Sequence, residues 1–221
     1  MAKFGNIYLS WRKGSGHSRH IVGVIKTSAK NGVTFNYLSS KELEKAKADG
    51  FLYYTEFPEL DKTYNTSVLE IFGQRLFRSE RSDYLEFLSF WGIESIHKDD
   101  IAYLLAHTQG IVPTDNFEFL ADFMVTKDLK IVSEIASLTY TKVPSSAINI
   151  KTELKWKTNP SIHDKFQVDL YAPNGLLIGH VKKIHSKVFF NKRSNNIRVY
   201  VKSIEKNGIL KRVFIEIINK V

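Results

Sequence analysis

Cysteine is absent from the 221 residues of the chain. Disulfides and thiolate metal sites are therefore excluded, and a reducing, cytoplasmic setting fits the composition. Residues 1–6 lack the apolar run of a signal peptide, and no apolar stretch is long enough to cross a membrane. The sequence thus predicts a cytoplasmic protein without a membrane partner.

Signatures of common chemistries are also missing. Gly14–Gly16 lies in a basic turn, but the Lys-Ser/Thr of a phosphate-binding P-loop does not follow, so we expect a plain hairpin. His17 and His20 have no obvious third ligand, which favours surface histidines over a metal site. Asp99 and Asp100 could form a nuclease carboxylate pair, although capping of a helix explains them more simply. A Gly-x-Ser-x-Gly elbow is also missing. We therefore expect that the protein is not an enzyme and that it binds no cofactor and no metal.

The charge that is present is unevenly distributed. Residues 1–122 hold 14 Lys/Arg and 16 Asp/Glu, whereas residues 123–221 hold 18 and 7. The net charge of +9 therefore comes from the second half of the chain. Such asymmetry is typical of a surface that binds a polyanion such as nucleic acid. The alternative is a solubilising surface, which would normally mix both signs.

Hydrophobic periodicity predicts an α+β fold in two domains, 1–122 and 123–221, with the boundary region near 127–130. Ser67 with Glu70 forms a capping-box pattern, and Gly92 is a natural helix stop. In the first domain we expect strands over 7–11, 20–25, 33–37 and 114–119, and helices over 43–48, 68–76, 83–91 (capped by Ser82) and 101–107. In the second, mostly β domain we expect strands over 147–156 and 168–171, then a hairpin of 197–204 and 209–218 whose Asn207-Gly208 turn is type I′.

A polar turn in the second half is followed by two short strands. The stretch reads Asn159-Pro160…Asp164, Val168-Asp169-Leu170-Tyr171, Asn174-Gly175 and Ile178-Gly179-His180-Val181-Lys182-Lys183. It resembles the core signature of HIRAN domains. The resemblance implies a small barrel-like module that binds DNA, notably single-stranded 3′ ends, and that is usually attached to remodelling or repair enzymes.

Candidate DNA-binding residues gather in this region. Basic residues interleaved with aromatic residues suit single strands, because charge follows phosphates while rings stack on bases. These residues are Lys165, Lys182, Lys183, Lys187, Phe189, Phe190, Lys192 and Arg193. By resemblance to HIRAN proteins, the pocket for the DNA end also includes Tyr140, Asn159, His163 and Asp164.

Two of these assignments have alternatives. Both phenylalanines could belong to the core, but adjacent residues on a strand point in opposite directions, so we expect one buried and one exposed. Asp164 could accept a hydrogen bond from a terminal 3′ hydroxyl, or it could simply cap its turn.

The first half carries a second resemblance. It rests on Val22-Gly23-Val24, Phe35-Asn36-Tyr37, Phe57-Pro58, Phe72-Gly73-Gln74-Arg75-Leu76, Arg81, Gly92-Ile93 and Leu104-Leu105-Ala106…Gly110. These residues look like the N-terminal subdomain of HipA-type toxin kinases, without the kinase body. The resemblance implies a docking unit. Two hypotheses follow: a DNA-binding protein in repair, defence or a toxin–antitoxin system, or a subunit that docks a kinase or other effector through residues 1–122.

Overall fold

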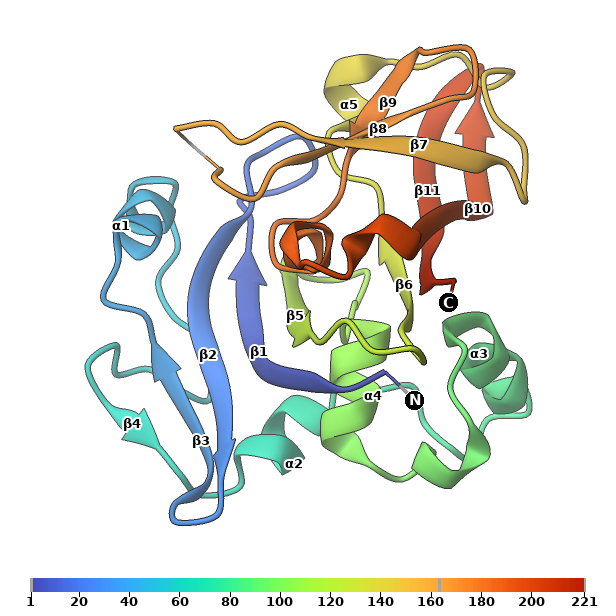
Figure 1. Ribbon diagram of the computed structural model, residues 1–221. Coiled ribbons are helices and arrows are strands. Elements are labelled where there is room, and N and C mark those ends of the chain that lie inside the picture. Colours follow the sequence, from blue (N-terminus) through green and yellow to red (C-terminus); the bar gives the residue numbers. More distant parts are fainter. Residues whose placement is uncertain (1, 163, 221) are drawn as a thin grey trace. The chain divides into compact units, whose positions relative to one another are not determined.

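The computed structural model describes residues 2–162 and 164–220 (Figure 1). Two antiparallel sheets and a few helices make the fold α+β, as predicted. The chain divides into two compact units. We call Phe4–Asp122 the N-terminal unit, and Met1–Lys3 with Phe123–Val221 the C-terminal unit. Among the helices of the described residues, none has the length and hydrophobicity needed to cross a membrane.

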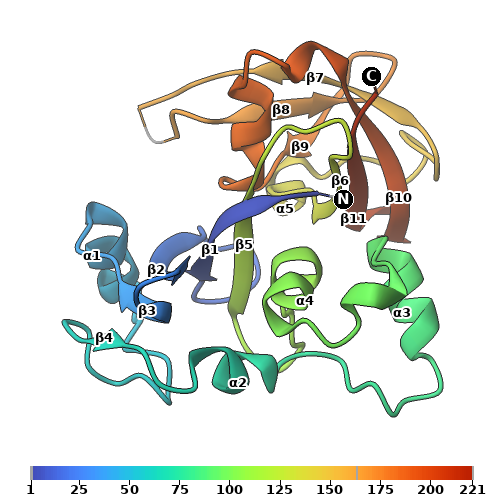
Figure 2. The ribbon, with the colours of Figure 1, turned by 60° about the horizontal axis from the view of Figure 1, so that its bottom comes forward.

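The N-terminal unit is a five-stranded sheet with helices. Its strands are β1 (Phe4–Trp11), β2 (His20–Ser28), β3 (Gly32–Tyr37), β4 (Thr63–Tyr64) and β5 (Phe117–Phe123). Its helices are α1 (Lys41–Ala48), α2 (Val68–Gly73), α3 (Tyr84–Trp91), the 3₁₀ helix η1 (Ser95–His97) and α4 (Ile101–Thr108). The strand order is β4-β3-β2-β1-β5, so the last strand of the unit lies beside the first (Figure 2).

Local capping chemistry explains two helix ends that the sequence predicts in this unit. Asp100 accepts a hydrogen bond from the Tyr103 amide at 3.0 Å, so the helix-capping interpretation is confirmed for Asp100. Gly92 ends α3 with a φ of 67°, as expected of a glycine stop. The capping box was wrong: Ser67 has a φ of 50° and makes no side-chain cap bond. The helix also ends at Gly73 rather than at residue 76.

The core of the N-terminal unit is aromatic. Phe35 packs against Phe57 and Phe72, each at 5.1 Å between ring centroids, and all three side chains are fully buried. Arg75 links two segments at the edge of this core. Its guanidinium binds the Asp115 carboxylate and donates to the backbone carbonyl of Gly110 at 3.1 Å. Arg75 is therefore a structural residue.

The predicted position of His20 also needs correction. His20 was expected on the surface, but it is 5% exposed, and its Nε2 lies 2.7 Å from Asp49 Oδ2. Its position on β2, whose first six residues are all buried, carries the ring inward. His17, in the preceding turn, is exposed as expected.

The C-terminal unit is built on a six-stranded sheet in the form of a half-barrel. Its strands are β6 (Lys130–Glu134), β7 (Glu153–Thr158), β8 (Val168–Tyr171), β9 (Leu177–His180), β10 (Ile197–Asn207) and β11 (Ile209–Asn219). Its helices are α5 (Leu138–Thr141) and the 3₁₀ helices η2 (His185–Phe190) and η3 (Ser194–Asn196). The strand order is β6-β11-β10-β7-β8-β9.

The two edge strands of this sheet, β6 and β9, are joined by hydrogen bonds just beyond the end of β6. After β6, the Ala136 amide donates to the His180 carbonyl of β9 at 2.8 Å, and the His180 amide donates to the Ala136 carbonyl at 3.0 Å. Gly179 permits this approach, because a Cβ atom there would lie 2.4 Å from the Ala136 oxygen. The glycine of the Ile-Gly-His-Val run is thus required where the curved sheet closes.

Two details of the predicted strands were wrong. The strand expected over 147–156 begins at Glu153, because Lys151 has a φ of 69° and breaks the extended backbone. Ile150 is consequently 59% exposed. In the hairpin of β10 and β11, Gly208 has a φ of 67° while Asn207 remains in the strand, so the turn is not type I′.

Candidate nucleic-acid interface

The polar turn between β7 and β8 is closed by its own hydrogen bonds. The Asn159 amide donates to the Gln167 carbonyl at 2.9 Å, which extends the β7–β8 ladder to the mouth of the turn. Inside the turn, Asp164 Oδ1 accepts from the Phe166 amide at 2.9 Å, and the Asp164 amide donates to Ser161 Oγ at 3.1 Å. Asp164 therefore does cap its turn. His163, predicted as a site residue, lies outside the described residues.

A buried carboxylate organises the polar side chains on the adjoining strands. Asp169, in β8, is 4% exposed and accepts hydrogen bonds from Asn159 Nδ2 at 2.8 Å and Gln167 Nε2 at 2.9 Å. His180 Nδ1 lies 2.8 Å from Asp169 Oδ1, and the Tyr171 hydroxyl is 3.3 Å from Oδ2. We call these five residues the Asp169 cluster.

The electrostatics of the Asp169 cluster favour the ionised carboxyl. Burial alone would raise the pKa of Asp169, but the hydrogen bonds from Gln167, Asn159 and His180 outweigh burial and lower it. The carboxylate in turn fixes the orientation of the Asn159 amide and the His180 ring. Asn159, predicted to contact DNA, thus has its amide group engaged with Asp169.

Sequence reasoning missed Asp169 and His180 as members of the site. A signal was present, because alternation with Val168 and Leu170 placed Asp169 on the opposite face of its strand. The cross-strand register pairs Asp169 with Lys157 on one side and His180 on the other, and register was not available from the pattern.

The two adjacent phenylalanines have different environments. Phe189 is 2% exposed and packs edge-on against Trp156 at 4.9 Å. Phe190 is 37% exposed and packs against Phe166 at 5.3 Å. The prediction of one buried and one exposed ring is confirmed, although the cause differs: both lie on η2, where successive side chains turn by about 120°.

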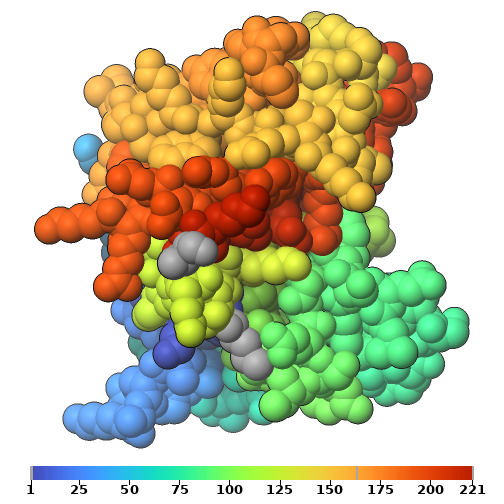
Figure 3. Space-filling model, turned by 45° about the vertical axis from the view of Figure 1, so that its right-hand side comes forward, coloured from blue at the N-terminus to red at the C-terminus, as the bar shows by residue number. Residues whose placement is uncertain are grey.

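Exposed cations accompany the half-buried ring of Phe166 and the exposed ring of Phe190. Lys165 places its Nζ 5.2 Å from the centroid of Phe166. Lys192 and Arg193 come after Asn191, the residue that ends η2, and both are exposed. Side chains of the orange-red part of the chain project from the surface in Figure 3. We call Lys165, Phe166, Phe190, Lys192 and Arg193 the basic-aromatic corner.

The remaining predicted cations are less accessible. Lys182 is 1% exposed, and its Nζ lies 3.4 Å from Glu134 Oε2. The prediction that Lys182 reaches a phosphate was wrong, because its ammonium is enclosed in the protein. Lys183 and Lys187 are half-buried.

Tyr140 occupies a different place from the turn. It is 71% exposed on α5. The next residue, Thr141, donates from its hydroxyl to the Ile178 carbonyl at 2.8 Å, so β9 positions this helix.

Comparisons with known proteins add one likeness. No protein-family model matches the chain, and no curated protein matches it. A crystal structure of the HIRAN domain of human HLTF aligns at 16% sequence identity, covering 40% of this chain and 74% of that one, with a TM-score of 0.32. A score of this size does not establish a shared fold. The resemblance of residues 1–122 to HipA-type kinases is supported by none of these comparisons.

Proposed function

We propose that the C-terminal unit binds single-stranded DNA at the basic-aromatic corner, and that it does so without catalysis. The observation that carries this proposal is the exposed ring of Phe190, which packs against the half-buried ring of Phe166 beside Lys165. Lys192 and Arg193 add two exposed charges two and three residues after Phe190. An apolar ring that remains 37% exposed among cations suits a base that stacks while its phosphates meet the charges.

The expected contributions of stacking and charge to the affinity are large enough for a binding surface. Stacking on an exposed ring contributes about 1–3 kcal/mol per base. Each cation that neutralises a phosphate of a single strand adds about 0.7 to the slope of log affinity against log salt. Two rings and three cations are therefore enough for a site that holds a few nucleotides at moderate salt.

Asp164 supports a preference for strand ends within this proposal. Its Oδ1 is occupied by the Phe166 amide, and its Oδ2 has no hydrogen bond from the described part of the chain. A terminal 3′ hydroxyl can donate to that oxygen, whereas a 3′ phosphate would be repelled by the carboxylate. Capping of the turn and binding of a strand end are thus compatible roles for one carboxylate.

Fluorescence anisotropy of the full chain with labelled oligothymidylate tests the proposal. Lys192→Ala with Arg193→Ala is expected to weaken binding and to reduce the salt slope by about 1.4. Phe190→Ala should weaken binding with little change in slope, because stacking carries no net charge. Lys206→Ala, an exposed lysine at the end of β10, is the matched control and should bind like the wild type.

The end preference needs a separate comparison. Oligonucleotides with a 3′ hydroxyl should bind more tightly than those with a 3′ phosphate, and Asp164→Asn should reduce that difference. Equal affinity for both ends would remove the role of Asp164. Binding that the double substitution at 192 and 193 leaves unchanged would remove the corner itself.

We also propose, as a second candidate, that the N-terminal unit binds a protein partner. Leu52 and Tyr53, in the loop that follows α1, are 70% and 47% exposed, so two large apolar side chains that are consecutive in the chain face solvent. Recovery of a partner by the wild-type chain and its loss with Leu52→Ser and Tyr53→Ser would support this role. Recovery of the same partner by both variants would contradict it.

A further inference from the structure

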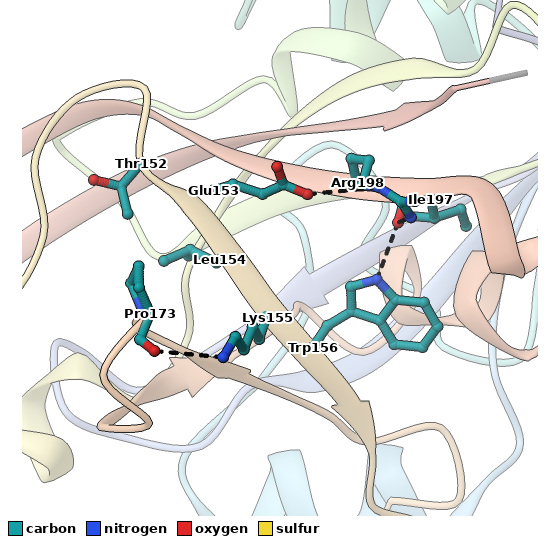
Figure 4. A pocket seen from close by; sticks show the side chains of 8 residues that line it. All are labelled: Thr152, Glu153, Leu154, Lys155, Trp156, Pro173, Ile197 and Arg198. Atoms are coloured by element: carbon teal, nitrogen blue, oxygen red, sulfur yellow. Dashed lines mark hydrogen bonds and ion pairs between the residues drawn. The ribbon is translucent and has the colours of Figure 1, made fainter.

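An open pocket of about 860 Å³ lies where β7 and β10 part. The described register between the two strands consists of Val199 with Leu154 and Tyr200 with Glu153. Toward Ile197 the strands separate, and the Trp156 indole donates from Nε1 to the Ile197 carbonyl at 3.1 Å (Figure 4). A side chain thus satisfies a carbonyl that would otherwise belong to the sheet ladder, and the surface opens beside it. We call this the β7–β10 pocket.

Rigid, flat apolar groups line part of the pocket. Trp156 is half-buried, held at one end by the Ile197 carbonyl and packed against Phe189 at 4.9 Å. Pro173, in the turn between β8 and β9, contributes a second rigid apolar surface (Figure 4). An indole fixed in this way loses little conformational entropy when a planar ligand stacks on it.

Two cations belong to the same pocket. Lys155 places its Nζ 3.4 Å from the Pro173 carbonyl, a long contact that an anion can replace. The Arg198 side chain is 42% exposed, and its Nε lies 3.5 Å from Glu153 Oε1. Its Nη1 donates to the carbonyls of Asn195 and Ile197 at 3.2 and 3.1 Å. The contacts of Arg198 with described residues thus use Nε and Nη1, which leaves Nη2 to meet an anion.

The geometry points to a nucleotide of a single strand as the occupant, with its base on Trp156 and a phosphate between Lys155 and Arg198. This inference rests on the proposed function, since it gives the same strand a second contact. An uncharged apolar ligand would leave both cations unused, and an acidic peptide would leave the fixed indole unexplained. A nucleotide uses the planar group and the charges together.

The pocket and the corner are connected by β7. Trp156 lies three residues before Asn159, at the mouth of the polar turn, which is a distance of about 10 Å along the strand. Phe189 of the pocket and Phe190 of the corner are neighbours on η2. A strand that ends at the corner can therefore reach the pocket within a few nucleotides.

Replacing Glu153 should change the affinity for the nucleic acid in the opposite direction from replacing Lys155 or Arg198. Its carboxylate pairs with Arg198 and would repel an incoming phosphate. Glu153→Gln is therefore expected to raise the affinity about threefold, whereas Lys155→Ala and Arg198→Ala should each lower it about threefold and reduce the salt slope by about 0.7. All three side chains are at least partly exposed, so folding is not at stake.

The experiment uses anisotropy of the full chain with labelled oligothymidylate of about 12 nucleotides at several salt concentrations. Lys206→Ala removes the same charge eight residues along β10 from Arg198, about 26 Å away, and serves as the control. If the wild type binds and the corner variants weaken binding while Arg198→Ala and Lys155→Ala match the control, the pocket inference fails alone. An unchanged or lower affinity of Glu153→Gln also overturns it. If the wild type does not bind, or the corner variants bind normally, the proposed function fails first.

Discussion

Replacing Gly179 by alanine should open the closure of the half-barrel. An added Cβ would lie 2.4 Å from the Ala136 carbonyl oxygen and 2.7 Å from Ile135 Cγ2. The first contact is with backbone, so it cannot be relieved by turning a side chain. The segment after β6 must therefore move away from β9.

The cost can be worked from what that movement breaks. The pair formed by Ala136 and His180 contains two hydrogen bonds, each contributing about 0.5–1.5 kcal/mol. Overpacking against Ile135 adds about 1–3 kcal/mol. Alanine returns about 0.4–1 kcal/mol by restricting the unfolded chain, so the net loss should be about 1–5.5 kcal/mol.

Two measurements check this value. Denaturant unfolding gives the change in the free energy of unfolding, and hydrogen exchange at the amides of Ala136 and His180 reports the closure directly. The second is needed because two units can unfold separately, in which case one midpoint does not describe the chain. Gly14→Ala is the control, since its Cβ would meet His17 Nδ1 at 3.9 Å and nothing closer. If Gly179→Ala keeps wild-type stability and amide protection, the account of the closure is wrong.

Three other perturbations have definite expected outcomes. Burial lowers the pKa of His107 to about 4 from 6.5. The free energy of unfolding should therefore keep its full value above about pH 6.5 and fall by about 3 kcal/mol as the pH drops to 4. Urea midpoints across that range measure this loss, and His107→Gln should flatten the pH profile. Asp169→Asn should cost about 2–3 kcal/mol by thermal unfolding, because an amide presents a donor to groups that already donate to the carboxylate; an unchanged melting temperature would contradict the role of the Asp169 cluster. Arg75→Lys should cost about 1–3 kcal/mol, since an ammonium cannot span both the Asp115 carboxylate and the Gly110 carbonyl, whereas Arg78→Lys at an exposed position should cost nothing measurable.

Features of the fold that depend on neighbours in the sequence could be predicted. The cap at Asp100, the stop at Gly92 and the turn at Gly175 each follow from the chemistry of one residue and its immediate backbone. These are local decisions, so a pattern of a few residues contains the cause. The same holds for the hairpin of β10 and β11, whose alternation is long enough to define both faces.

Features of the fold that depend on pairing between distant segments could not be predicted from the sequence. Alternation over 147–156 gave no sign that Lys151 takes a positive φ, because the start of β7 is fixed by its register with β10 and β8. The need for glycine at 179 is equally non-local, since the atom it makes room for belongs to Ala136. The sequence resemblance placed that glycine correctly but contained no reason for it.

The candidate site shows the same division in its charges. The count of basic residues predicted a positive C-terminal half, but two carboxylates of the half-barrel form ion pairs with several of these residues. Glu134 lies near Lys182 and Arg212, and Glu216 lies near Lys130 and Lys202. Each of these partners is remote in sequence, so no local pattern separates a paired lysine from one that faces a ligand. Exposed cations occur across the C-terminal unit, Lys206 among them, and those of the basic-aromatic corner and of the β7–β10 pocket form two local groups. Because both lie beside aromatic rings, the cations on which a nucleic acid would act are a smaller and more localised set than the net charge suggests.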